Sequence, residues 1–111
     1  MASFERYDVV RVPFPFTDRQ AEKIRPALVI SDATFNRAAG HSVMAMITSA
    51  GHAPRPLDVP ISDLKAAGLP APSIVRFKLF TLDHRLMRGK LGRLAEKDQA
   101  TTQKAVRRLL P

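Results

Sequence analysis

The chain has 111 residues, with 18 Lys and Arg against 10 Asp and Glu for a net charge of +8, and no cysteine. A chain of this length with 45% hydrophobic residues can bury one modest core. Residues 1–111 are therefore expected to form a single domain, and a second domain is excluded. The absence of cysteine excludes a disulfide, a thiol nucleophile and a Cys-based zinc site. The uncharged stretch from Ala38 to Ala53 is too short to span a bilayer, and the N-terminus lacks an apolar signal segment, so a cytoplasmic protein is expected.

The positive charge is concentrated in the second half of the chain. Residues 1–55 contain 7 basic and 5 acidic side chains, whereas residues 56–111 contain 11 and 5. Between Arg76 and Arg93, six basic residues accompany only Asp83. Such a field favours an anionic partner, either a nucleic acid or an acidic protein. The alternative is a soluble basic surface that binds no ligand.

Three short strands are predicted in the first half. The β-branched run from Tyr7 to Val12 ends at Pro13-Phe14-Pro15, and residues 14–24 then predict a polar loop. Pro26 to Ser31 predicts the second strand, and Val43 to Thr48 a third that is apolar on both faces. A strand of this kind needs cover on both faces, and a partner subunit could supply the second cover.

Short helices connect these strands. Asp32 to Ala39 is expected to be helical, capped by Ser31 or Asp32 and ended by Gly40. Ser62 to Ala67 repeats the pattern, with Ser62 as the cap and Gly68 as the end. Both segments are predicted to be connectors.

The last part of the chain predicts one more strand, an extended piece and the only long helix. From Ile74 to Leu79 the residues alternate, which places Arg76 and Lys78 on one exposed face. After a turn near Asp83-His84, Arg85 to Leu94 is expected to be extended. Glu96 to Leu110 predicts a helix with acids in its first turn and Arg107 and Arg108 in its last. The fold class is therefore mainly β, a small and strongly bent antiparallel barrel whose closure removes exposed edges.

The sequence gives little support for a metal site, a nucleotide site or a carboxylate acid–base pair. His41, His52 and His84 match no local metal-ligand spacing, and no metal site is expected. The five glycines form no phosphate-binding loop, so no nucleotide or other cofactor is expected. Asp18 and Glu22 could pair as acid and base, although a solvated polar loop is the more ordinary explanation for them.

Two motifs mark strand ends with polar side chains. Arg25 stands directly before the most apolar strand, and Thr48-Ser49 closes the third. These motifs and others in the same order resemble the MazF/PemK toxin family: Tyr7-Asp8-Val9-Val10, Arg25-Pro26-Ala27-Leu28-Val29-Ile30-Ser31, Phe35-Asn36, Ile47-Thr48-Ser49, Pro72-Ser73-Ile74-Val75-Arg76, Leu79-Phe80-Thr81-Leu82-Asp83 and Leu91-Gly92-Arg93-Leu94. The resemblance covers essentially the whole chain.

The resemblance implies the toxin of a toxin-antitoxin pair, a homodimer of SH3-like barrels with a C-terminal helix that cuts single-stranded RNA without a metal. Its cognate antitoxin is expected to be acidic, to lie across the active groove and to bind DNA together with the toxin. By the same resemblance, the catalytic residues are Arg25 and Thr48. The expected RNA contacts are Lys23, Ser49, Arg76, Lys78, Thr81 and Arg85.

This pair suits cleavage by the ribose 2′-OH. Arg25 can supply fixed charge and forked donors to the phosphate, because a guanidinium stays charged and is a poor base. Thr48 can donate a hydrogen bond to a non-bridging oxygen or orient the 2′-OH. The group that removes the proton from the 2′-OH is left open by these two residues. DNA lacks that hydroxyl, so it should bind but remain intact.

The chain departs from the family pattern at three places. Gln20-Ala21-Glu22-Lys23-Ile24 replaces a loop that commonly has a Glu-Gln pair and a glycine, the Lys78-Leu79 region replaces a frequent glutamine, and Ala95 replaces the usual cap of the last helix. Two alternative functions remain: a non-catalytic nucleic-acid-binding barrel that uses the surface from Arg76 to Arg93, and a related toxin that poisons a protein such as a topoisomerase. Both predict no RNA fragments.

Overall fold

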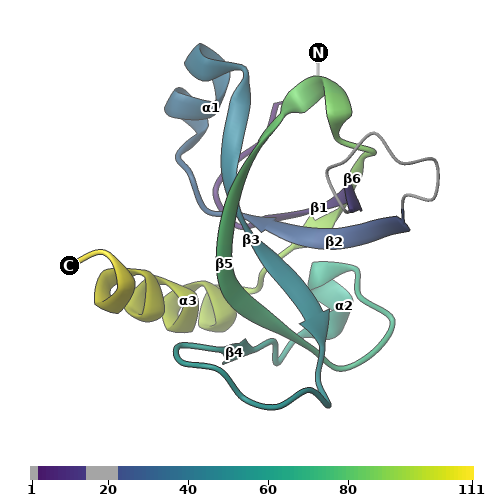
Figure 1. The fold of residues 1–111 in the computed structure, drawn as a ribbon, viewed down its shortest axis with the longest axis vertical. Helices are drawn as coiled ribbons and strands as arrows, with labels where there is room; N and C mark the ends of the chain where they lie inside the picture. The colour runs from purple at the N-terminus through teal and green to yellow at the C-terminus, as the bar shows by residue number, and fades with distance from the viewer. Residues whose placement is uncertain (1–2, 15–22) are drawn as a thin grey trace.

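The computed structural model describes residues 3–14 and 23–111 (Figure 1). Within them, six strands form one antiparallel sheet in the order β4-β5-β3-β2-β1-β6, which confirms the mainly β class. The strands are β1 (Asp8–Phe14), β2 (Lys23–Val29), β3 (His41–Ser49), β4 (Val59–Pro60), β5 (Ser73–Asp83) and β6 (Lys90–Arg93). The helices are α1 (Ala33–Ala39), α2 (Leu64–Ala67), α3 (Glu96–Leu109) and the 3₁₀ turn η1 (His84–Leu86). None of the described helices is long and apolar enough to cross a membrane.

The sheet is curled but not closed. Its two end strands, β4 and β6, do not pair with each other in the described parts of the chain, so the expectation that barrel closure removes the edges is wrong. Both edges are short, and α3 contacts β4 while α2 contacts β6. Short, covered edges solve the same problem that closure would solve, because they offer little backbone for pairing with another chain.

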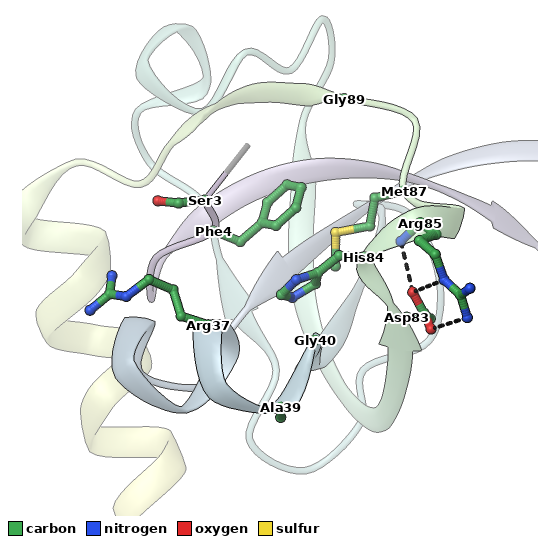
Figure 2. Close-up of a pocket in the computed structure, with 10 residues that line it drawn as sticks. All are labelled: Ser3, Phe4, Arg37, Ala39, Gly40, Asp83, His84, Arg85, Met87 and Gly89. Carbon is green, nitrogen blue, oxygen red and sulfur yellow. Dashed lines mark hydrogen bonds and ion pairs between the residues drawn. The ribbon is translucent and has the colours of Figure 1, made fainter. Parts of the chain in front are cut away.

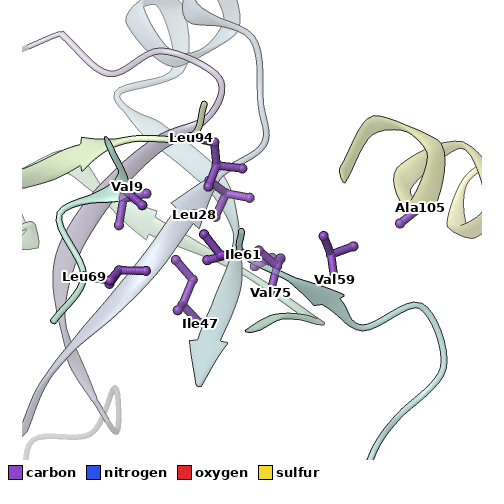
Figure 3. Packing of buried hydrophobic residues seen from close by; sticks show 11 residues of the cluster. Val9, Leu28, Ile47, Val59, Ile61, Leu69, Val75, Leu94 and Ala105 are labelled. Atoms are coloured by element: carbon purple, nitrogen blue, oxygen red, sulfur yellow. The ribbon is translucent and has the colours of Figure 1, made fainter. Parts of the chain in front are cut away.

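Two apolar clusters lie on opposite faces of the sheet. Cluster 1, shown in Figure 3, gathers Leu28 and Ile47 with residues of α2 and α3, whereas cluster 2 gathers Val29 and Met44 with Phe4. Both faces of β2 and β3 are therefore covered within one chain. The second cover that a partner subunit could supply thus comes from the chain itself, through the curled sheet and the N-terminal segment.

Helix α2 packs directly against β6 at two glycines. Gly68 ends α2 with a φ of 72°, and a Cβ there would collide with the carbonyl of Leu91. A Cβ at Gly92 would approach the Ala66 carbonyl oxygen to 2.5 Å. These positions require glycine because backbone meets backbone with no room for a side chain.

Helix α3 is fixed to the turn before α2 by a buried carboxylate. Asp98 accepts hydrogen bonds from the Ser62 hydroxyl at 2.6 Å and from the Ser62 and Asp63 amides, each at 3.0 Å. Burial acts to raise the pKa of Asp98, but these hydrogen bonds outweigh it and lower the pKa below its ordinary value. Ser62 is thus not the helix cap that its position predicted, because its hydroxyl donates to Asp98 and Asp63 caps α2 instead.

Other boundaries differ from the sequence predictions. The proposed loop 14–24 includes Lys23 and Ile24, which belong to β2, and the rest of it between residues 15 and 22 lies outside the described chain. The segment from Arg85 to Leu94 is not uniformly extended, since the side chain of Asp83 caps η1 before β6 begins. Helix α1 is capped by Asp32 and ends at Gly40 as predicted, and Ala95, at the cap position before α3, makes no side-chain cap.

Candidate nucleic-acid interface

Arg25 lies in the exposed half of β2, next to the hairpin partner β1. It pairs across the sheet with Val12, and its guanidinium carbon lies 6.0 Å from the centre of the Phe14 ring. A cation at this distance over an aromatic face is attracted by the ring quadrupole. No described carboxylate pairs with Arg25 or with the exposed Lys23 nearby. Among described side chains, these two cations are therefore available to an anion.

Thr48 lies near the end of β3, opposite Ile74 of β5, and is half-buried. Ser49 follows it, exposed, with its hydroxyl 3.3 Å from Nε2 of His52. Polar groups thus cluster at this end of the strand, where the apolar core stops.

The strand ladder between β2 and β3 ends at Ala27 opposite Met46, and Arg25 and Thr48 each lie two residues beyond that last pair. Past this point β2 stays paired with β1, and β3 with β5, so the two strands part (Figure 1). Two residues of strand span roughly 7 Å, so both side chains lie close to the point of separation.

Pro26 gives a physical reason for this separation. The Val29 carbonyl accepts from Tyr7 on the β1 side, while the Ile30 amide donates to Val43 on the β3 side. Backbone groups alternate along a strand, so the backbone of Pro26 faces β3. Proline has no N–H, and the donor that would continue the ladder is missing at that position. The Arg25-Pro26 pair thus ends the ladder and leaves Arg25 at the opening.

Arg25 and Thr48 also belong to the same face of the sheet. Ala27, Val29 and Met44 all pack in cluster 2, and side chains two residues apart share a face. Counting from Ala27 and Met44 places Arg25 and Thr48 on that face. The two predicted catalytic residues are brought to one opening from strands more than twenty residues apart in the sequence.

Arg76 is held by a carboxylate rather than exposed. Its side chain is 13% exposed, its Nη2 donates to Asp58 Oδ2 at 3.0 Å and to the Ala53 carbonyl at 3.0 Å, and its Nε lies 3.3 Å from Asp58 Oδ1. The hydrogen bond from Arg76 holds the pKa of Asp58 below its ordinary value, although burial opposes this. The expectation that Arg76 and Lys78 form an exposed cationic face is therefore wrong for Arg76, which fixes the loop between β3 and β4.

Other cations of the basic stretch are paired in the same way. Asp8 is fully buried, and its Oδ1 lies 3.1 Å from Lys90 Nζ and 3.1 Å from Arg93 Nη1. Arg85 binds Asp83, which lowers the pKa of Asp83 to about 2. Three of the six basic residues in this stretch thus bind Asp8 or Asp58, two acids that lie outside it in the sequence, and Arg85 binds the one acid inside it.

The remaining predicted RNA contacts spread along β5, away from Thr48. Lys78 is exposed in a bulge, because Arg76 and Leu79 pair with adjacent residues of β3. Thr81 pairs with Val43, five residues from Thr48, which is about 17 Å along a strand. Arg85 lies further still, in η1. The structure places Lys23 near Arg25 and Ser49 beside Thr48, the two predicted catalytic residues, and it does not bring Thr81 or Arg85 there.

A cavity of about 900 Å³ lies at the other end of β3 (Figure 2). It is lined by Phe4, Met87 and His84 among others, and of the predicted site residues it includes only Arg85. The His84 ring lies 4.9 Å from Phe4, and its Nε2 is 2.8 Å from the Ser42 hydroxyl. Burial lowers the pKa of His84, although Asp83 opposes this effect. This cavity is therefore distinct from the opening beside Arg25 and Thr48.

The described residues contain no group of three or more His, Asp or Glu side chains that could hold a metal ion. The proposed pair Asp18 and Glu22 lies outside the described residues. The sequence considered His52 only as one of three histidines without a metal-ligand spacing, and it did not single out Asp58. Asp58 has no motif of its own, and only the folded loop places it against Arg76.

The protein is therefore a small, mainly β domain that presents two cations where its curled sheet opens. The family model of the PemK-like, MazF-like toxin of type II toxin-antitoxin systems matches residues 5–110, and the chain belongs to this family. No match was found among curated proteins.

Solved structures share the fold. A Deinococcus radiodurans MazE–MazF complex (Form-III) is 21% identical with a TM-score of 0.77, over 98% of this chain and 97% of that one. MazF (Form-I) of the same organism is 23% identical with a TM-score of 0.76, over 99% and 98%. An endoribonuclease in complex with its cognate antitoxin from Mycobacterial species is 20% identical with a TM-score of 0.75, over 99% and 95%.

Proposed function

We propose that this toxin is a metal-independent, sequence-selective endoribonuclease that cleaves single-stranded RNA in the cytoplasm. The observation that carries the proposal is the position of Arg25 and Thr48 on one face, at the opening where β2 and β3 part. The activity named for a structural relative, an endoribonuclease in complex with its cognate antitoxin, supports the same class of reaction.

In this reaction the 2′-oxygen attacks the adjacent phosphorus while the bond from phosphorus to the 5′-oxygen breaks. Arg25 neutralises the charge that develops on the phosphorane. Electrostatic stabilisation of this kind is usually the largest single contribution to the rate of an enzyme reaction. Thr48 donates a hydrogen bond to a non-bridging oxygen or orients the 2′-OH. The products carry a 2′,3′-cyclic phosphate and a 5′-OH, because the attacking oxygen stays on the upstream ribose.

The central experiment is the incubation of purified protein with a long RNA in EDTA, followed by mapping of the fragment ends. We expect defined cleavage sites, 5′-OH ends, and no cleavage where the scissile nucleotide carries 2′-hydrogen. A 5′-phosphate end would mean that water attacks instead and would contradict the roles of both residues. An absence of fragments would favour one of the two non-nuclease alternatives.

Thr48 allows a matched pair of variants. Thr48→Val keeps the shape and removes the hydroxyl, so cleavage should slow, whereas Thr48→Ser should retain much more activity. Thermal unfolding of both variants provides the control, because Thr48 is only half-buried and its loss should leave the fold intact. Equal activity of the Val variant and the wild type would remove Thr48 from the mechanism.

We further propose two protein partners, a second copy of this chain and an acidic cognate antitoxin. The exposed apolar side chains of Phe35 and Leu86 offer surface to a second copy. Helix α1 and the turn η1, which carry them, lie next to each other. The Phe35 ring contacts His41, and His41 pairs with Asp83 just before η1. The antitoxin proposal rests on the net charge of +8 and on the antitoxin complexes formed by structural relatives. Light scattering should give about twice 12.3 kDa for the free toxin.

A further inference from the structure

We propose that His52 is the general base of this chain, the group that accepts the proton of the 2′-OH during RNA cleavage. The inference rests on the proposed ribonuclease function and names a role that Arg25 and Thr48 do not fill. A guanidinium stays protonated and a threonine hydroxyl is a weak base, so neither takes up a proton readily near neutral pH. Histidine is the side chain whose ordinary titration range spans neutrality.

The position of His52 carries the proposal. It lies four residues after Thr48 in the exposed loop that follows β3, where its Nε2 is 3.3 Å from the Ser49 hydroxyl. The loop lies on the face of Thr48, because Arg76, whose cross-strand partner Met46 shares that face, binds the Ala53 carbonyl directly after His52. A hydroxyl at this distance can orient an imidazole ring. The two other histidines belong to the opposite end of β3, where His41 is the first residue and His84 is bonded to Ser42.

The loop that carries His52 is fixed on both sides. The Ala50 amide donates to the Pro72 carbonyl at 2.9 Å before His52, and the Ala53 carbonyl accepts from Arg76 at 3.0 Å directly after it. Asp58 then binds the same guanidinium, so one arginine ties two points of the loop to β5. An exposed histidine on an anchored loop keeps its position without burial, which suits a group that must meet RNA and exchange protons with water.

The proton balance is complete without a further reactant. As the bond from the 2′-oxygen to phosphorus forms, the 2′-OH proton moves to the neutral imidazole of His52. The departing 5′-oxygen takes a proton from water, and the imidazolium later returns its proton to solvent. Removal of a general base lowers a rate by about 10²- to 10⁴-fold, so the effect is measurable in single-turnover cleavage.

The experiment compares His52→Ala with the wild type and with His41→Gln, a histidine variant at the opposite end of β3. We expect His52→Ala to lose at least about 10²-fold in rate, to recover activity on addition of free imidazole, and to keep its unfolding temperature. His41→Gln should cleave normally. A merely structural role of His52 would give no recovery with imidazole.

A substrate with sulfur in place of the scissile 5′-oxygen tests the direction of proton transfer. Sulfur leaves without a proton, so it would restore the rate of His52→Ala if His52 were a general acid, and we expect no restoration. Recovery with this substrate, or full activity of His52→Ala, would overturn the proposal while the ribonuclease function stands. If the wild-type protein and Arg25→Ala alike cut no RNA, the proposed function fails and the role of His52 fails with it.

Discussion

Two basic regions of this protein behave differently in the fold. The stretch from Arg76 to Arg93 is the more basic in sequence, yet Arg76, Arg85, Lys90 and Arg93 bind carboxylates. Lys23 and Arg25 of β2 are fewer, yet no described carboxylate pairs with them. The density of charge along the sequence therefore does not indicate which cations are available to an anionic ligand, because a paired cation already has a counter-ion within the protein.

The largest effect expected in the paired region concerns Asp8. Asp8→Ala removes a fully buried carboxylate that binds Lys90 and Arg93 and accepts from the Glu5 amide at 2.9 Å, so the free energy of unfolding should fall by about 2 kcal/mol. Urea denaturation measures the change. Arg85→Ala, at an exposed ion pair, is the control and should change stability little, because the cap that Asp83 makes with the backbone stays in place. Equal effects of the two substitutions would mean that burial does not distinguish these pairs.

The largest effect expected at the unpaired region concerns catalysis. Arg25→Ala should lower the rate of RNA cleavage by roughly 10²-fold or more, with nearly unchanged folding, because it removes a charged contact to the transition state. Arg25→Lys should restore only part of the rate, since it keeps the charge and loses the planar fork. Arg85→Ala is the matched control, because its guanidinium binds Asp83 at the other end of β5. Comparable losses in the two alanine variants would contradict the distinction between the regions.

A smaller effect is expected from closing the opening itself. Pro26→Ala supplies an N–H where β2 faces β3, which allows the ladder to continue past Ala27 and Met46. Cleavage should fall by roughly tenfold, because Arg25 and Thr48 would be misplaced, while thermal stability should be unchanged or higher. Hydrogen exchange reports whether the new amide of residue 26 is protected by a bond to β3. A protected amide together with unchanged cleavage would show that the end of the ladder does not position the site.

The salt dependence of RNA binding should show that a cation of the unpaired region contacts a phosphate and that a cation of the paired region does not. Each phosphate contact to a single strand contributes about −0.7 to the slope of log K against log salt. Lys23→Ala should reduce the slope by about this amount, and Arg93→Ala, which removes a partner of Asp8, should leave it unchanged. A reduced slope in Arg93→Ala would mean that RNA competes with the ion pair.

The smallest effect is the acid dependence of the paired region. The pKa of Asp58 is lowered by Arg76, so its contribution to stability is present above the ordinary value of 3.8 and is lost as the pH falls through the lower, folded-state value. Asp58→Asn should therefore flatten the fall in unfolding temperature below about pH 4. A variant with an acid branch identical to that of the wild type would show that Asp58 does not contribute.

Local signals in the sequence were sufficient for several elements. Asp32 and Gly40 bracket α1 as predicted, because a carboxylate cap and a left-handed glycine act within one turn. The catalytic candidates Arg25 and Thr48 were likewise identified from intact motifs, and their roles stay predictions. Ser62 shows where local reasoning stops, since its hydroxyl binds Asp98, 36 residues away.

The sequence by itself determined the mainly β class, the short connecting helices, the long α3 and the family, because these depend on residue periodicity, capping and contiguous motifs. Only the tertiary structure decided that Arg76 binds Asp58, that Lys90 and Arg93 share Asp8, and that β2 and β3 part beside Arg25 and Thr48. The physical reason is that a charge is neutralised by whichever carboxylate the fold brings within a few ångströms. That distance depends on the curl of the whole sheet rather than on any local run of residues.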